Sequence, residues 1–248
     1  MLVKSSDGIY TLNGFSNFKK LICGFSTKKL GDMSLGSGRK SDDGKVPINK
    51  FVKTLGAKNP KIVLAEQTHG NEIARVSKKN AGEKVKGSDG LITKDKNLFL
   101  TVFVADCLPI VAFDPKKQIV GIAHAGWRGT LKRIAGKLIK AFKEQGSRAQ
   151  DILVGFGPGV EFCHYEVKRD VADKFKRSGQ KKSIMESVSG KIYLDLKLAN
   201  IEQLVATGVP RANLDVSLKA CTYENKDLFS YRAGDKNKRF AAVIGLIG

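Results

Sequence analysis

The chain has 248 residues, of which 42% are hydrophobic and 27% charged, a composition ordinary for a globular protein with a sizeable core. Its 44 lysines and arginines outnumber 24 aspartates and glutamates and give a net charge of +20, with no basic tail. This charge favours the binding of polyanions or of phosphate-bearing substrates. However, the lysines do not interleave with aromatic residues, as a surface that binds single-stranded nucleic acid requires. A lysine-rich solvated surface is the simpler interpretation, and nucleic acid is not an expected partner. The sequence shows no targeting segment and no apolar run of membrane-spanning length, so we expect a cytoplasmic protein with no membrane partner.

The pattern of apolar residues predicts more strands than helices. In chain order, a polar loop is expected over 27–47, and strands over 61–66, 72–76, 98–105, 109–113, 118–123, 152–157, 191–196, 214–218 and 239–246. The strand at 98–105 is almost wholly apolar and should be buried on both faces, and "DPKK" at 114–117 reads as a hairpin turn. An amphipathic helix is predicted over 131–142, with Gly146 after its end, and weaker helices over 167–176 and 196–207.

This succession of strands and helices favours a mixed α/β or α+β fold in a single domain over residues 1–248. No glycine-rich dinucleotide fingerprint and no Walker lysine motif is present, so nothing indicates a nucleotide-cofactor or P-loop site. The four cysteines lie far apart without a CxxC pair, and in a reducing compartment each is expected to pack in the core unless a neighbour recruits it: Cys23, Cys107, Cys163 and Cys221.

The residues that could carry chemistry follow predicted strands. His69 lies in "EQTHGN", Cys107 in "VADCLP" and His124 in "IAHAGWRG". Two imidazoles and one thiolate can hold zinc and leave a fourth position for water or substrate, the arrangement of catalytic zinc sites. The spacing alone does not decide this. A buried cysteine with two loop histidines, or a metal-free hydrolase in which Cys107 is the nucleophile and His124 its base, fits the same residues.

Several blocks resemble a known family. "EQTHGNEIARV", "SDGLIT", "VADCLPIVAFDP", "IAHAGWRGT" and "DLFSYRAGDKNKRFAAVIGL" are similar to the polyphenol oxidase, or laccase-domain, proteins, whose members are more recently described as purine nucleoside phosphorylases. The resemblance runs from about residue 24 to residue 246. It implies one mixed α/β domain with sheets packed between helices. It also implies that the zinc ligands are His69, Cys107 and His124, which would act in catalysis through the metal.

The implied activity is phosphorolysis of adenosine, inosine or guanosine, with methylthioadenosine as a further substrate and adenosine deamination as a further activity. A nucleoside and phosphate would then be the small-molecule partners. Arg128 and Arg232 are candidate phosphate or substrate contacts, because a guanidinium matches the geometry of phosphate. Asp106 and Asp89 are candidate carboxylates for orienting a metal-bound imidazole.

Two regions depart from the family pattern and put the substrate range in question. "LGDMSLGSGRKSDD" is shortened and altered, and "SYRAGDKNKR" carries Ala233 at a position that is usually arginine. Copper could substitute for zinc, but with three histidines in the whole chain a multicopper cluster cannot be built. The alternatives to a phosphorylase are a zinc amidase that edits peptidoglycan precursors, a copper-dependent phenol oxidase side activity, and a non-enzymatic basic RNA-associated protein.

Overall fold

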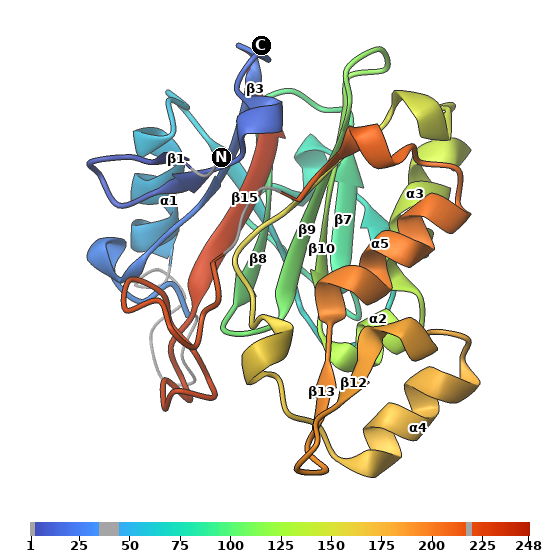
Figure 1. Ribbon diagram of the computed structural model, residues 1–248. Coiled ribbons are helices and arrows are strands. Elements are labelled where there is room, and N and C mark those ends of the chain that lie inside the picture. The colour runs from blue at the N-terminus through green and yellow to red at the C-terminus, as the bar shows by residue number, and fades with distance from the viewer. Residues whose placement is uncertain (1–2, 35–44, 217–219) are drawn as a thin grey trace.

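The computed structural model describes residues 3–34, 45–216 and 220–248, and its architecture is built on two mixed sheets that face each other (Figure 1). Sheet A has the order β1 (Val3–Lys4), β2 (Tyr10–Thr11), β3 (Leu21–Phe25), β15 (Phe240–Leu246), β8 (Leu98–Val104), β4 (Lys61–Ala65), β6 (Lys84–Val85). Sheet B has the order β14 (Leu214–Asp215), β11 (Leu153–Phe156), β9 (Leu108–Asp114), β10 (Ile119–Ala125), β7 (Gly90–Thr93), β5 (Ile73–Arg75). A separate hairpin pairs β12 (Ile184–Glu186) with β13 (Ile192–Leu194).

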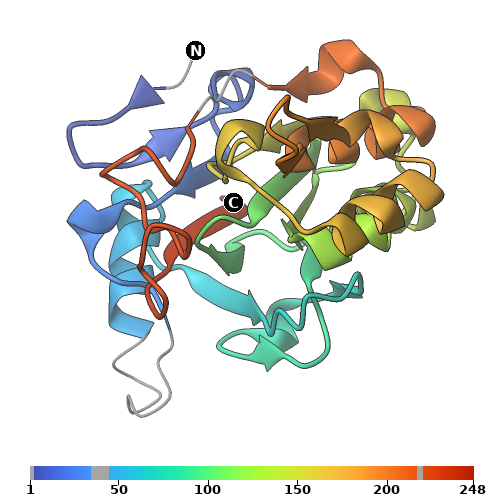
Figure 2. The ribbon, with the colours of Figure 1, turned by 60° about the horizontal axis from the view of Figure 1, so that its bottom comes forward.

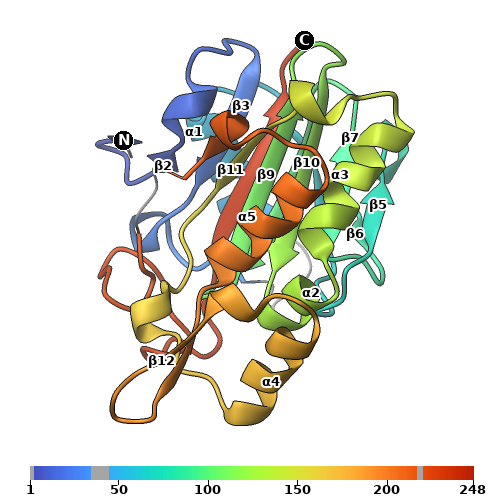
Figure 3. The ribbon, with the colours of Figure 1, turned by 45° about the vertical axis from the view of Figure 1, so that its right-hand side comes forward.

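Helices cover the outer faces of both sheets, which confirms the expected layers. Helix α1 (Lys45–Thr54) packs on sheet A, while α3 (Ile134–Glu144) and α5 (Leu196–Ala206) cover sheet B (Figures 1 and 3). The apolar side chains between the sheets form the largest core cluster, to which β8 contributes Leu98, Leu100, Val102 and Val104. Burial on both faces explains the continuous apolar run of β8. None of the helices in the described ranges is long and apolar enough to span a membrane.

The strand predictions agree with the structure within two or three residues at each end. Six strands in the described ranges were not predicted, most of them short or partly polar: β1, β2, β3, β6, β7 and β12. The expected loop over 27–47 is only partly correct, because α1 begins at residue 45, and 35–44 lie outside the described residues, with most of "LGDMSLGSGRKSDD". Residues 217–218 of the strand expected over 214–218 also lie outside them.

The helix expected over 131–142 is present as α3 but starts three residues later, and residues 127–131 form a separate short helix. Helix α2 (Trp127–Leu131) stops before Arg133, whose φ of 64° lies in the left-handed region, and α3 starts at Ile134. The side chains of Asn200 and Gln203 bond the hydroxyl and carbonyl oxygens of Thr130 at 3.0 and 2.7 Å. These contacts from α5 hold the end of α2 in place, so tertiary structure overrides the local periodicity. The remaining helix, α4 (Arg169–Arg177), matches the prediction for 167–176.

The topology brings three loops to one end of the sheets. The chain leaves sheet A after β4 and after β8, which are parallel, and on each occasion it enters sheet B. The first residue of β9, Leu108, pairs with the last of β10, Ala125, and β15 starts opposite Val104, the end of β8. Loops 66–72 and 105–107, the end of β10 and the segment before β15 therefore converge on the face that Figure 2 brings forward.

Candidate metal centre

Three potential metal ligands meet where these loops converge. One ligand atom from each of His69, Cys107 and His124 lies within 4.8 Å of the other two. Cys107 Sγ is 4.0 Å from His69 Nε2, and the two imidazole rings meet edge to face with centroids 4.8 Å apart. His69 and Cys107 are on the loops between the sheets, whereas His124 lies inside β10 rather than in the loop expected after it. The sheet topology thus assembles donors that are far apart in sequence.

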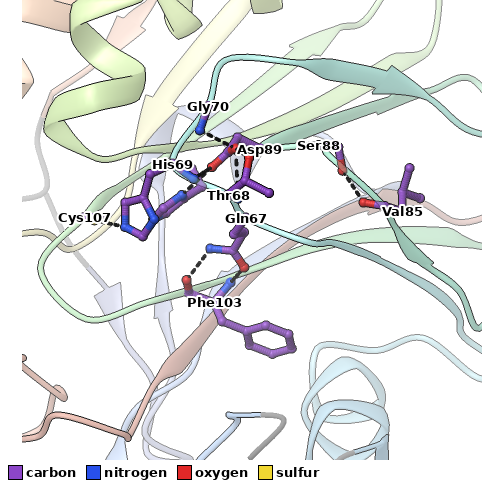
Figure 4. A network of polar contacts seen from close by, with 10 residues as sticks. Gln67, Thr68, His69, Gly70, Val85, Ser88, Asp89, Phe103 and Cys107 are labelled. Atoms are coloured by element: carbon purple, nitrogen blue, oxygen red, sulfur yellow. Dashed lines mark hydrogen bonds and ion pairs between the residues drawn. The ribbon is translucent and has the colours of Figure 1, made fainter. Parts of the chain in front are cut away.

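The buried carboxylate of Asp89 organises the loop that carries His69 (Figure 4). Asp89 accepts the backbone N–H groups of Thr68, His69 and Gly70 at 3.1, 2.9 and 2.6 Å, and also the hydroxyl of Thr68 at 3.0 Å. Gln67 and His69 both have positive φ, of 65° and 58°. This backbone is unfavourable for side-chain-bearing residues, and the hydrogen bonds to Asp89 offset the cost.

Asp89 also orients the imidazole of His124. Its Oδ1 lies 3.0 Å from His124 Nδ1, and both side chains are buried. A proton held on Nδ1 leaves Nε2 as the lone-pair donor, which is how a carboxylate commonly fixes a metal-binding histidine. The pKa of Asp89 is below its usual range, because the contacts with His124, Gly70 and Thr68 outweigh desolvation.

Cys107 favours its thiolate form. Burial alone would raise the pKa of the thiol, but the charge and hydrogen bond of His124, together with His69, lower it to about 6. Burial would lower the pKa of His124, but the Cys107 thiolate and Asp89 raise it to about 9. Before a metal binds, the pair is therefore charged at neutral pH. A bound metal would displace the Nε2 proton of His124 and take the thiolate, which is the form of cysteine that binds metals.

The space among the three donors fits one small cation. Zinc–sulfur and zinc–nitrogen bonds place tetrahedral ligands about 3.6 Å apart, near the 4.0 Å between Cys107 Sγ and His69 Nε2. Gly126 leaves this space open, because a Cβ there would lie 3.0 Å from Cys107 Sγ and 3.2 Å from His69 Cδ2. A set of one sulfur and two nitrogen donors suits zinc, and three protein ligands leave one position for water or substrate.

The donors lie in a large and predominantly basic cleft of about 1260 Å³. The lining includes six basic side chains: Lys84, Arg128, Lys191, Arg232, Lys236 and Arg239. Arg128 lies over the Trp127 ring at 4.4 Å, and Arg232 lies over the Tyr165 ring at 4.7 Å. Stacking on an aromatic face holds each guanidinium plane in a defined direction. The cleft can therefore present two oriented cations to an anion.

The structure places Asp106 differently from Asp89. Asp106 Oδ1 accepts the hydroxyls of Thr222 and Ser230 at 2.6 and 2.7 Å, and Oδ2 accepts the N–H of Arg232 at 2.8 Å. These contacts of the Asp106 carboxylate are with the chain before β15 and not with an imidazole. Since Asp106 has a φ of 85° next to Cys107, these bonds hold the turn that presents the thiol.

Two residues with a place in the site were not singled out from the sequence. The side-chain amide of Gln67 bonds both the carbonyl and the N–H of Phe103, at 2.6 and 2.8 Å, and so extends the contact between β4 and β8 (Figure 4). Tyr165 is buried in the cleft wall, and desolvation raises the pKa of its hydroxyl, which stays protonated. The glutamine beside His69 in "EQTHGN" was the available signal; nothing in the local sequence pointed to Tyr165.

The fold and the site together define a mixed α/β protein in which one cysteine and two histidines form a candidate metal centre in a basic cleft. Residues 17–247 match the family model described as multi-copper polyphenol oxidoreductase laccase, and the chain belongs to this family. It is 30% identical to the purine nucleoside phosphorylase YlmD of Bacillus subtilis (strain 168), over 93% of this chain and 90% of that protein. It is 32% identical to adenosine deaminase RL5 from an unknown prokaryotic organism, over 72% of each chain. The crystal structure of YlmD from Geobacillus stearothermophilus superposes with a TM-score of 0.89 at 30% identity, covering 100% of this chain and 99% of that one.

Proposed function

We propose that the protein is a zinc-dependent purine nucleoside phosphorylase that acts on adenosine, inosine or guanosine, and on methylthioadenosine. The observation that carries the proposal is that the three donors and the two stacked arginines line one cleft. Relatives about 30% identical over most of their length bear the name purine nucleoside phosphorylase. The proposed enzyme is one domain over residues 1–248 and works in the cytoplasm.

In the proposed reaction a phosphate oxygen bonds to C1′ of the ribose while the bond from C1′ to the purine nitrogen breaks. The electron pair leaves with the purine, which gains the proton that the attacking hydrogen phosphate loses. Arg128 and Arg232 bind the phosphate and hold it for in-line attack, since a guanidinium donates two parallel hydrogen bonds to a phosphate. Zinc held by His69, Cys107 and His124 would supply Lewis acidity at this point of the cleft.

Asp89 keeps His124 in the tautomer that offers Nε2, and Asp106 fixes the Cys107 turn. The protonated hydroxyl of Tyr165 is available as a hydrogen-bond donor to the substrate. These residues position the reacting groups, and positioning supplies much of the rate of a two-substrate reaction.

Adenosine deamination is the second candidate activity. It is favoured by the relative named adenosine deaminase and by the three-donor site, which leaves room for a fourth ligand. A multicopper oxidase mechanism is not favoured, because only two of the chain's three histidines are in this centre. Copper bound in place of zinc should give at most a weak phenol oxidase activity.

The test is a chromatographic screen of zinc-loaded protein with each nucleoside, with and without phosphate. Inosine with phosphate should yield hypoxanthine and ribose 1-phosphate, and phosphate-independent conversion of adenosine to inosine should report deamination. Cys107→Ala should abolish both reactions, while Cys23→Ser, in a buried strand of sheet A, should retain them. If zinc-loaded protein leaves every purine nucleoside intact, the proposal fails. Peptidoglycan peptides and salt-dependent RNA binding are then the next assays.

A further inference from the structure

A second group of potential metal ligands lies beside the same cleft, whose lining includes Cys163 and His164. One ligand atom from each of His164, Cys221 and Glu224 lies within 4.8 Å of the other two. Cys221 Sγ is 3.7 Å from His164 Nδ1, and Glu224 Oε1 is 3.6 Å from His164 Nε2. These residues share no member with the first centre. They were not expected to act together, since the cysteines were predicted to pack in the core.

A fourth donor lies against this group. Cys163 Sγ is 3.1 Å from His164 Nδ1, and Cys163 is exposed, contrary to the expectation of core packing. Adjacent residues rarely point the same way, but the 3₁₀ turn at Phe162–His164 directs this thiol and imidazole to one point. The distances of 3.1 and 3.7 Å from Nδ1 to the two sulfurs bracket the roughly 3.6 Å separation of tetrahedral zinc ligands.

The backbone holds the two segments that supply these donors side by side. Gly159 and Cys221 form a parallel bridge, and the N–H of Thr222 bonds the carbonyl of Gly159 at 3.0 Å. The N–H of Glu161 points to Cys221 Sγ at 3.5 Å. Outer hydrogen bonds of this kind are typical around metal ligands.

We propose that His164, Cys221 and Glu224, with Cys163 as fourth ligand, bind a second zinc ion that ties segment 161–164 to segment 221–224. Four protein ligands close the coordination shell, so this site is structural, in contrast to the open three-donor centre. The exposed carboxylate of Glu224 turns with little hindrance from the ring nitrogen toward the ion. The tie bears on the first centre, because Thr222, next to Cys221, bonds the Asp106 carboxylate beside Cys107.

The test counts zinc in the full-length protein after dialysis against excess Zn²⁺ and removal of free metal. The wild type should bind two ions, Cys107→Ala one, Cys221→Ser one, and the double variant none. Cys23→Ser is the matched control. Cys23 belongs to neither group of ligands, so this variant should bind two zinc ions. Cobalt in the Cys107→Ala protein should give thiolate-to-metal charge-transfer absorption, which disappears when Cys221→Ser is added.

Surface variants keep the test valid if the buried Cys221→Ser protein unfolds. His164→Asn and Glu224→Gln change partly exposed side chains, and in the Cys107→Ala background each should lower zinc affinity by at least tenfold. One ion in the wild type and none in Cys107→Ala overturns the proposal, as does a second ion that survives both surface variants. Because the readout is metal content, the result is independent of whether the protein turns over nucleosides.

Discussion

Gly126→Ala should damage the metal centre while leaving the fold intact. The backbone of Gly126, with φ of −76° and ψ of 170°, is in the extended region that alanine adopts freely. Gly126 is the N-cap of α2 and no side chain caps that helix, so the cost to the free energy of unfolding should stay below about 1 kcal/mol. The new methyl group is the perturbation.

Its cost to metal binding follows from two distances. The added Cβ would lie 3.0 Å from Cys107 Sγ and 3.2 Å from His69 Cδ2, whereas heavy atoms in ordinary contact are about 3.5–4.0 Å apart. The donors must therefore retreat by a few tenths of an ångström, beyond the roughly 0.2 Å that a metal site tolerates. Displaced ligands of this kind cost about 10- to 100-fold in metal affinity, or about 1.4–2.8 kcal/mol.

The assay is competition for Zn²⁺ between the protein and a chelating dye, alongside thermal unfolding of the metal-free protein. Gly136→Ala is the matched control, because its Cβ would meet only Thr207 Cγ2, at an ordinary 3.7 Å, inside helix α3. That variant should bind zinc like the wild type and gain up to about 1 kcal/mol of stability. If Gly126→Ala binds zinc within twofold of the wild type, the packing argument for this site is refuted.

Three further outcomes test the site's polar contacts. Asp89→Asn should lower zinc affinity by about 10- to 100-fold and the free energy of unfolding by about 2–4 kcal/mol, because an amide cannot accept all the hydrogen bonds that the carboxylate accepts. Dye competition measures the affinity, and urea unfolding measures the stability. In metal-free protein, labelling of the Cys107 peptide by iodoacetamide should rise with pH and level off just above the pKa of about 6, where the thiolate is complete. The pKa of Cys163 is raised by partial desolvation and by the nearby Cys221 and Glu224, so its labelling should keep rising above pH 9. A Cys107 profile that parallels Cys163 in mass spectrometry contradicts the thiolate assignment. Arg128→Gln and Arg232→Gln should each raise the KM for phosphate by tenfold or more, with lysine at the same position restoring part of the loss; an unchanged KM removes that arginine from the anion site.

The elements that have a strong local sequence pattern were predicted correctly from the sequence. The long apolar strands β8, β9, β10 and β15 have the period and length that burial between layers imposes, and they were predicted within two residues at each end. Polar side chains after strands likewise pointed to His69, Cys107 and His124. The family resemblance, which the family model confirms, supplied the reason to group them.

What could not be predicted depends on contacts between distant segments. The break between α2 and α3 at Arg133 follows from side chains of α5 that bind the end of α2. No residue near 133 indicates this break in the sequence. Asp106 bonds residues more than 110 positions away, so its place could not follow from its neighbours in sequence. The pairing of His164 with Cys221 is of the same kind.

The position of β15 determines when the site can form during synthesis. This strand, among the last residues of the sequence, lies between β3 and β8 in the middle of sheet A and is buried along its length. All three donors of the first centre are made before residue 125, yet β8 lacks one of its two neighbours until β15 emerges. The ribosome therefore adds more than a hundred residues after the thiol and the two imidazoles have been made and before β15 can complete sheet A next to β8. Pairing at such long sequence separation is slow, so Cys107 is most exposed to oxidants and to the wrong metal ion before β15 is made.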